Sequence, residues 1–193
     1  MTRWVKAGVV GLAFLSACGG LAGTAKKEDL SELLRTLDEA KQKGKVGSVA
    51  GFLYLFLPGP PTALRDWPVR MIPLSPTLER AVTLSREQFA RSGSMPLTAA
   101  ALESAGQPIT DYVKRLEATG HKELIRRVNT ETGTDPKFTF QDVPQGRWLL
   151  LAELPSKISV LLWAVPVTVT EGQVTWQSLN DKSLWLEGVT PNR

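Results

Sequence analysis

The sequence predicts a mainly β protein: an antiparallel β-sandwich with a helical insertion and an N-terminal amphipathic helix. Two patterns favour this fold class. Short segments rich in Val, Phe, Trp and Leu are separated by Gly, Pro and Asp turns, and most of them follow residue 123. A block with helical spacing, 77–120, separates the early strand-like segments from the late ones, so strands and helices do not alternate as they do in parallel α/β folds.

The composition fits one globular domain and excludes several kinds of site. Of the 193 residues, 42% are hydrophobic and 22% are charged, which is ordinary for a chain with a packed core. One Cys and one His cannot form an internal disulfide, a thiolate zinc cluster or a His-pair metal site. The net charge of +4 includes Arg3 and Lys6 near the N-terminus. The rest of the chain is close to neutral, so we expect no nucleic-acid partner. Because the usual metal ligands and phosphate-binding motifs are missing, we also expect no metal and no cofactor.

Residues 1–17 have the pattern of a secretory signal peptide. A short basic segment precedes the uncharged run 7–17, which is too short to span a membrane and contains several small residues. The alternatives are an ordinary cleaved leader and a buried first helix that happens to end in a Cys. Residues 18–27, which follow the run, are small and polar and are typical of a tether.

The run ends in Leu15-Ser16-Ala17-Cys18, which resembles the lipobox of bacterial lipoproteins. The resemblance implies cleavage before Cys18, a diacylglycerol thioether on its sulfur and acylation of the new N-terminus. Several acyl chains would hold the protein stably on a membrane. Gly19, where some lipoproteins have Asp, implies an outer-membrane location by the best-known sorting rule.

Residues 28–44 predict the amphipathic helix, because leucines recur at helical spacing, acidic residues come early, lysines come late and Gly44 can end it. We expect this helix to pack on the domain, with docking to a partner as the alternative. Residues 45–180 are expected to form the sandwich, with the insert at 77–120 and a tail at 181–193. Its strands are expected at 45–57, 67–74, 124–129, 138–141, 147–154, 159–170 and 173–179, and its helices at 77–91, 96–105 and 108–119.

Residues 137–154, KFTFQDVPQGRWLLLAEL, resemble the signature of carboxypeptidase-regulatory-like domains. Its central positions match and Trp148 stands where the family has Tyr; residues 49–51, 61–72 and 165–179 resemble neighbouring strands of the family. The resemblance implies a transthyretin-like (prealbumin-like) sandwich and no peptidase activity, because the family takes its name from a non-catalytic domain. The 77–120 insert is absent from the compact family form. From the residues alone, Pro144 and Gly146 predict a tight turn with a positive φ at the glycine.

The late strands are apolar on both faces. Alternation places Trp148, Leu150 and Ala152 on one face of their strand and Leu149 and Leu151 on the other. The next strand repeats this with Val160, Leu162 and Ala164, although the outer face of a sandwich sheet is normally polar. We expect the helical insert and the 28–44 helix to cover the second face, with a protein partner as the alternative.

No motif for catalysis is present. His121 and Glu123 form an isolated H-x-E pair without the cysteines of zinc deaminases, so His121 is expected at the surface near a helix end. Because no nucleophile–base motif occurs, we expect no enzyme; a hydrolase whose carboxylates meet only on folding is the third alternative.

The tryptophans are the candidate ligand contacts. The chain has six, of which Trp148 and Trp163 fall on predicted core faces. Trp185 is the best candidate for exposure and Trp67 is the second candidate for ligand contact. The sequence thus favours a lipid-anchored envelope lipoprotein that acts as a non-catalytic binding or scaffolding module, with an envelope protein or a glycan as partner. The alternative is a carbohydrate-binding module.

Overall fold

The structure is a computed structural model, and it describes residues 30–56, 61–92, 97–155 and 159–189. The predicted signal peptide, the tether and Cys18 lie outside these residues. In chain order the elements are α1 (Ser31–Gln42), β1 (Val46–Phe52), β2 (Tyr54–Leu55), β3 (Thr62–Ala63), β4 (Pro68–Pro73), α2 (Pro76–Ser92), α3 (Ala99–Ala118), the 3-10 turn η1 (Lys122–Leu124), β5 (Arg126–Asn129), β6 (Lys137–Pro144), β7 (Gly146–Pro155), β8 (Ser159–Val169), β9 (Val174–Trp176), the 3-10 turn η2 (Asp181–Ser183) and β10 (Leu186–Val189).

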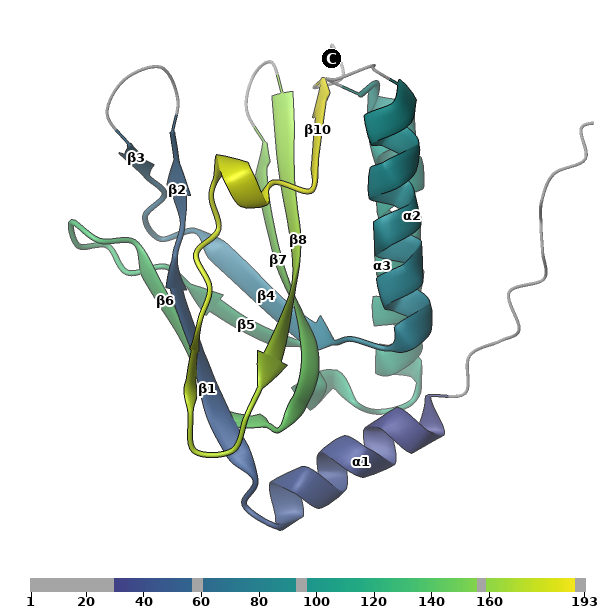
Figure 1. Cartoon of the computed structure of the whole chain (residues 1–193), viewed down its shortest axis with the longest axis vertical. Coiled ribbons are helices and arrows are strands. Elements are labelled where there is room, and N and C mark those ends of the chain that lie inside the picture. Colours follow the sequence, from purple (N-terminus) through teal and green to yellow (C-terminus); the bar gives the residue numbers. More distant parts are fainter. Residues whose placement is uncertain (1–29, 57–60, 93–96, 156–158, 190–193) are drawn as a thin grey trace, which may run out of the picture.

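Two sheets form a sandwich (Figure 1). The larger sheet has the order β10-β8-β7-β4-β5, and all of its neighbouring strands are antiparallel. The smaller sheet has the order β6-β1-β9, in which β1 is antiparallel to β6 and parallel to β9. With helices at 31–42, 76–92 and 99–118, this is the fold class that the sequence predicts.

The inner face of the larger sheet carries the predicted aromatic core. The β7–β8 register places Trp148 opposite Val167 and Ala152 opposite Trp163, so both indoles point to the same side. Each indole N–H is satisfied inside the core: Trp148 donates to the Pro144 carbonyl at 2.9 Å and Trp163 to the Asn180 carbonyl at 2.8 Å. These hydrogen bonds allow two large polar-edged rings to be fully buried between the sheets.

The second apolar face of the late strands is covered by the insert. Leu149 and Leu151 are buried, and Gly188 of β10 lies against the Leu102 side chain of α3. The expectation that the insert covers this face is therefore confirmed. The expectation is wrong for the 28–44 helix, because α1 packs at the end of the sandwich (Figure 1). There the Leu37 side chain lies close to Gly146 at the start of β7.

Two boundaries differ from the prediction. The helices expected at 96–105 and 108–119 form the single helix α3, with Pro108 inside it. The helix continues through the proline because one of its sides is buried on the larger sheet and α2, and this packing outweighs the lost backbone hydrogen bond. The prediction of a tail at 181–193 is also wrong in part, because residues 186–189 form β10, the edge strand of the larger sheet.

The β6–β7 turn explains the spacing of the D-V-P-x-G pattern. Asp142 has a φ of +51°, a left-handed conformation that Asp tolerates better than most side chains, and Gly146 has the predicted positive φ, at +151°. The Arg126 guanidinium donates to the Gln141 carbonyl and, at 2.8 Å, to the Asp142 carbonyl. Asp142 and Gly146 of this pattern thus each adopt a backbone conformation that few other residue types tolerate.

Candidate functional site

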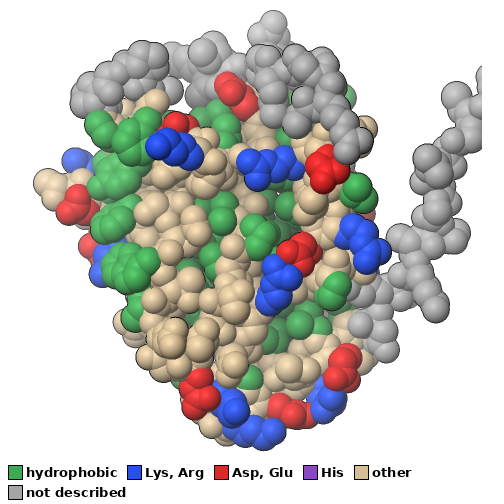
Figure 2. All heavy atoms as spheres, viewed as in Figure 1, with side chains coloured by type: hydrophobic (Ala, Val, Ile, Leu, Met, Phe, Trp, Pro, Cys, Tyr) green, Lys and Arg blue, Asp and Glu red, His purple; other side chains and the backbone are tan. Residues whose placement is uncertain are grey.

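Three aromatic side chains lie together, and we call them the aromatic strip: Phe52, Tyr54 and Trp176. Phe52 and Trp176 lie on the outer face of the smaller sheet, and Tyr54 belongs to β2, which pairs with β3 in a separate two-stranded sheet. The Phe52 and Trp176 rings are nearly parallel, with centroids 6.0 Å apart and an interplanar angle of 25°. The Phe52 and Tyr54 centroids are 6.1 Å apart. Figure 2 shows hydrophobic side chains following one edge of the molecule over β1 and β2. The strip is therefore a continuous aromatic surface, which isolated exposed rings would not form.

Strand alternation and register build the strip. Phe52 and Tyr54 are two residues apart, so their side chains leave the extended chain on the same side. The parallel pairing of β1 with β9 places Trp176 beside Ala50, whose small side chain leaves space for the indole. The Trp176 side chain is 58% exposed, which is unusual for so large an apolar side chain. Trp148 and Trp163, in contrast, are buried between the two sheets.

Polar groups flank the aromatic strip. The Lys137 ammonium lies 5.6 Å from the centroid of the Trp176 ring, and the Tyr54 hydroxyl donates to the Asp135 carboxylate at 3.0 Å. Desolvation, and then the hydrogen bond to Asp135, raise the pKa of Tyr54, which keeps the phenol a donor into more alkaline solution than usual. The strip thus combines flat apolar faces with a cation, a hydroxyl and a carboxylate at its edges.

This arrangement suits the binding of a ring with one apolar and one polar side. An exposed indole can stack on the C–H face of such a ring, while the flanking polar groups reach hydroxyls at its rim. A sugar has this shape. The stacked rings with polar groups at their edges therefore support binding of such a ring.

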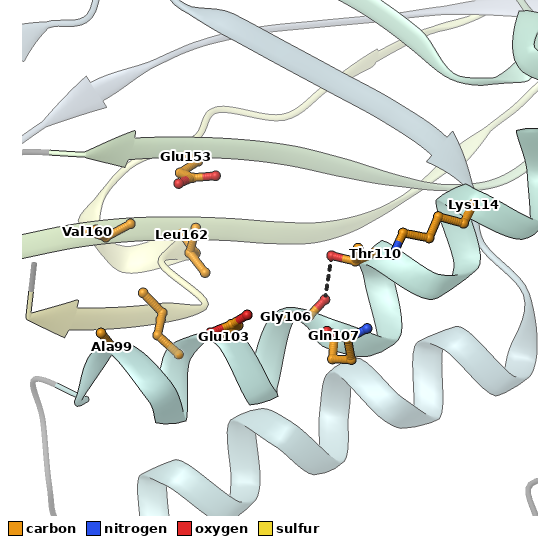
Figure 3. Close-up of a pocket in the computed structure, with 10 residues that line it drawn as sticks. Ala99, Glu103, Gly106, Gln107, Thr110, Lys114, Glu153, Val160 and Leu162 are labelled. Atoms are coloured by element: carbon orange, nitrogen blue, oxygen red, sulfur yellow. Dashed lines mark hydrogen bonds between the residues drawn. The ribbon is translucent and has the colours of Figure 1, made fainter. Parts of the chain in front are cut away.

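A second feature is a cleft of about 530 Å³ between α3 and strands β7 and β8 (Figure 3). Glu103 of α3 and Glu153 of β7 lie on opposite walls, and Lys114 lies further along α3. In the described part of the chain, neither carboxylate is hydrogen-bonded to another side chain. The third alternative, a hydrolase, requires two carboxylates that flank the scissile bond of a bound substrate.

The two tryptophans predicted from the sequence as candidate ligand contacts, Trp185 and Trp67, lie in different surroundings. The expectation that Trp185 is exposed is wrong: it is 5% exposed, and its indole N–H donates to the Val82 carbonyl of α2 at 3.1 Å. Trp67 is half-buried and donates to the Glu153 carbonyl at 2.7 Å. Trp67 lines a hollow of about 280 Å³ with Arg70, Arg127 and Glu153.

Sequence reasoning missed the aromatic strip, although a signal was present. The alternation of Phe52, Tyr54 and Phe56 within an otherwise apolar strand marks one face as aromatic. The contribution of Trp176 depends on its pairing with β1, a strand more than a hundred residues earlier. That pairing cannot be read from local pattern.

His121 lies at the end of α3, where we expected it, with its Nδ1 atom 3.4 Å from the Glu123 carboxylate. Among the residues that the structure describes, no group of three His, Cys, Asp or Glu side chains is placed to hold a metal ion. Within the same residues, no helix is both long and apolar enough to cross a bilayer.

Comparisons with known proteins give distant similarity to solved structures alone. No family model matches the chain, and no curated protein matches it. A solved structure of a Pseudomonas aeruginosa protein, whose proposed role is carbohydrate binding, aligns with a TM-score of 0.44 and 17% identity; the alignment covers 76% of this chain and 95% of that chain. A similarity at this level supports no inference about the present chain.

Proposed function

We propose that the chain is a bacterial envelope lipoprotein whose sandwich is a non-catalytic carbohydrate-binding module. The aromatic strip carries this proposal, because it presents the exposed Trp176 ring beside two half-buried aromatic rings, with polar groups at its rim. The strip lies on strands of a packed sandwich, so little conformational entropy is lost when a ligand binds.

A scaffolding role has weaker support than sugar binding. The protein-partner alternative depended on an uncovered apolar face on the late strands, and α2 and α3 cover that face with side chains of this chain. Among the described residues, Trp176 at one end of the aromatic strip is the most exposed of the large apolar side chains. A narrow aromatic surface fits a sugar ring better than the broad apolar core of a protein interface.

The lipobox at Leu15–Cys18 supports the anchoring part of the proposal. Cleavage before Cys18, lipidation of its thiol and retention at the outer membrane would hold the sugar-binding surface at the envelope. The tether at 18–27 would separate the acyl chains from the sandwich.

The anchor predicts a defined mass. The full-length product isolated from cells with detergent should have the mass of the chain starting at Cys18 plus its acyl chains. Cys18→Ser should remove the added mass and release the protein from the membrane fraction. Intact-mass spectrometry of both proteins checks this, and an unmodified or uncleaved wild-type N-terminus would contradict it.

The aromatic strip predicts loss of sugar binding in Trp176→Ala. The wild-type chain should bind members of an array of neutral oligosaccharides, and the variant should lose at least about tenfold in affinity, because the stacking face is removed. Isothermal titration calorimetry with the best array hit measures the change.

Leu84→Ala is the matched control for that experiment. Leu84 is 56% exposed, close to the 58% of Trp176, but it lies on α2 away from the smaller sheet. It should bind the same sugar as tightly as the wild-type chain. If the wild-type chain binds no sugar on the array, or if both variants lose affinity equally, the proposed function is wrong.

A further inference from the structure

Two arginines face each other on neighbouring strands of the larger sheet without an acidic partner. The β4–β5 register places Arg70 directly opposite Arg127, and both side chains are exposed. Like charges in directly opposed positions of a sheet repel each other and weaken the pair of strands. In the part of the chain that the structure describes, neither guanidinium forms an ion pair or a hydrogen bond.

The arginines border the 280 Å³ hollow beside Trp67. The hydrogen bond from the Trp67 indole to the Glu153 carbonyl fixes the orientation of the ring that forms one wall. Pro68 and Pro155 add rigid apolar surface to the lining. The hollow is slightly below the range of about 300–1,000 Å³ that is typical of small-molecule sites, so it suits one small ring.

Two carboxylates lie near the arginines. Asp66 accepts a hydrogen bond from the Asn129 amide at 2.8 Å. Glu153 lines the hollow, but its carboxylate forms no ion pair with Arg70 or Arg127 in the described residues. The two arginines and the one glutamate that line the hollow therefore give it a net positive charge, which would be larger without Glu153.

We propose that this hollow binds the oxyanion group, a carboxylate or sulfate, of an acidic sugar. Two guanidinium groups converging on one hollow can each donate charge-assisted hydrogen bonds to such a group, and their planar donors match its geometry. The Trp67 ring offers an apolar wall to the ring that carries the oxyanion. This site is on a different sheet from the aromatic strip and does not depend on it.

The test uses the full chain in detergent micelles with ¹⁵N-labelled tryptophan. Sodium glucuronate, glucose and sodium sulfate are titrated at constant ionic strength, and the Trp67 indole N–H signal is followed by NMR. Glucuronate should shift this signal at concentrations at which glucose does not, and it should bind more tightly than sulfate.

Four variants separate the proposed site from general charge effects. Arg70→Gln and Arg127→Gln should each weaken glucuronate binding by about tenfold, and Glu153→Gln should tighten it. Arg86→Gln, which removes an exposed charge from α2, should have no effect. Both arginines of the hollow are exposed, so these variants are expected to fold.

Several results would overturn the inference. Equal binding of glucose would show that the oxyanion is not recognised, and sulfate binding as tightly as glucuronate would remove the sugar from the proposal. If Arg86→Gln weakened glucuronate binding as much as the two hollow variants do, the effect would come from the net charge of the protein and not from the hollow. Trp176→Ala should leave the Trp67 shift unchanged, so failure of the aromatic strip as a sugar site can be distinguished from failure of this one.

Discussion

Gly51→Ala is expected to lower the free energy of unfolding by more than about 4 kcal/mol. A Cβ atom at Gly51 would lie on the carbonyl oxygen of Gln177 and 2.7 Å from Cζ of Phe138. The carbonyl belongs to the backbone, so it cannot give way as a flexible side chain would. The chain after β9 would have to move, and that movement breaks the hydrogen bonds from the Gln177 and Leu179 amides to the carbonyls of Ala50 and Phe52, each 2.8 Å long.

The same substitution should also disturb the proposed sugar surface. Trp176 is the residue before Gln177, so displacement of this segment separates its ring from Phe52. Urea denaturation followed by circular dichroism measures the stability, and calorimetry measures sugar binding. We expect both to fall together.

Gly106→Ala is the control for Gly51→Ala. Gly106 lies inside α3, and no neighbouring heavy atom is within 4 Å of its added Cβ. Alanine is a better helix former than glycine, so this variant should gain about 0.5–1 kcal/mol. A Gly51→Ala protein within about 1 kcal/mol of the wild type would contradict the close approach of β1 to the segment after β9.

The parts of the fold that the sequence predicts correctly are those specified by neighbouring residues. The alternation in 147–154 identifies β7 and its buried indole, and Pro144 and Gly146 specify the turn before it. The β10 strand lacks such a local signal: it has four residues and forms because β8 offers an open edge and α3 covers one side of it. Burial also explains why α3 continues through Pro108, although the proline itself favours a break.

The candidate sites were harder to predict than the fold, because each combines residues that are distant in sequence. The hollow takes Trp67 and Arg70 from the segment around β4, Arg127 from β5 and Glu153 from β7. Trp185 and Trp176 both lie in the last third of the chain, yet one is buried and the other exposed. The difference follows from their surroundings: α2 covers Trp185, and no described element covers the outer face around Trp176. Composition can count tryptophans, but only tertiary structure decides which of them reach a ligand.

Gly146→Val is expected to lower the free energy of unfolding by about 2–3 kcal/mol, which corresponds to a fall of about 5–10 °C in the melting temperature. Its φ of +151° is in a region that only glycine occupies without strain. The added Cβ would also lie 3.0 Å from Cδ2 of Leu37, so α1 would have to shift at the end of the sandwich. Differential scanning calorimetry measures the change.

Gly133→Val separates this requirement from the general cost of a β-branched residue. Gly133 is not among the positive-φ glycines, and no neighbouring heavy atom lies within 4 Å of its added Cβ, so its variant should melt within about 2 °C of the wild type. An unchanged midpoint for Gly146→Val would mean that the β6–β7 turn tolerates an L side chain. Backbone conformation would then not explain why the D-V-P-x-G pattern has a glycine at its last position. A large fall at Gly146 and none at Gly133 would instead show that the turn, the packing of α1 and the position of β7 depend on one backbone angle.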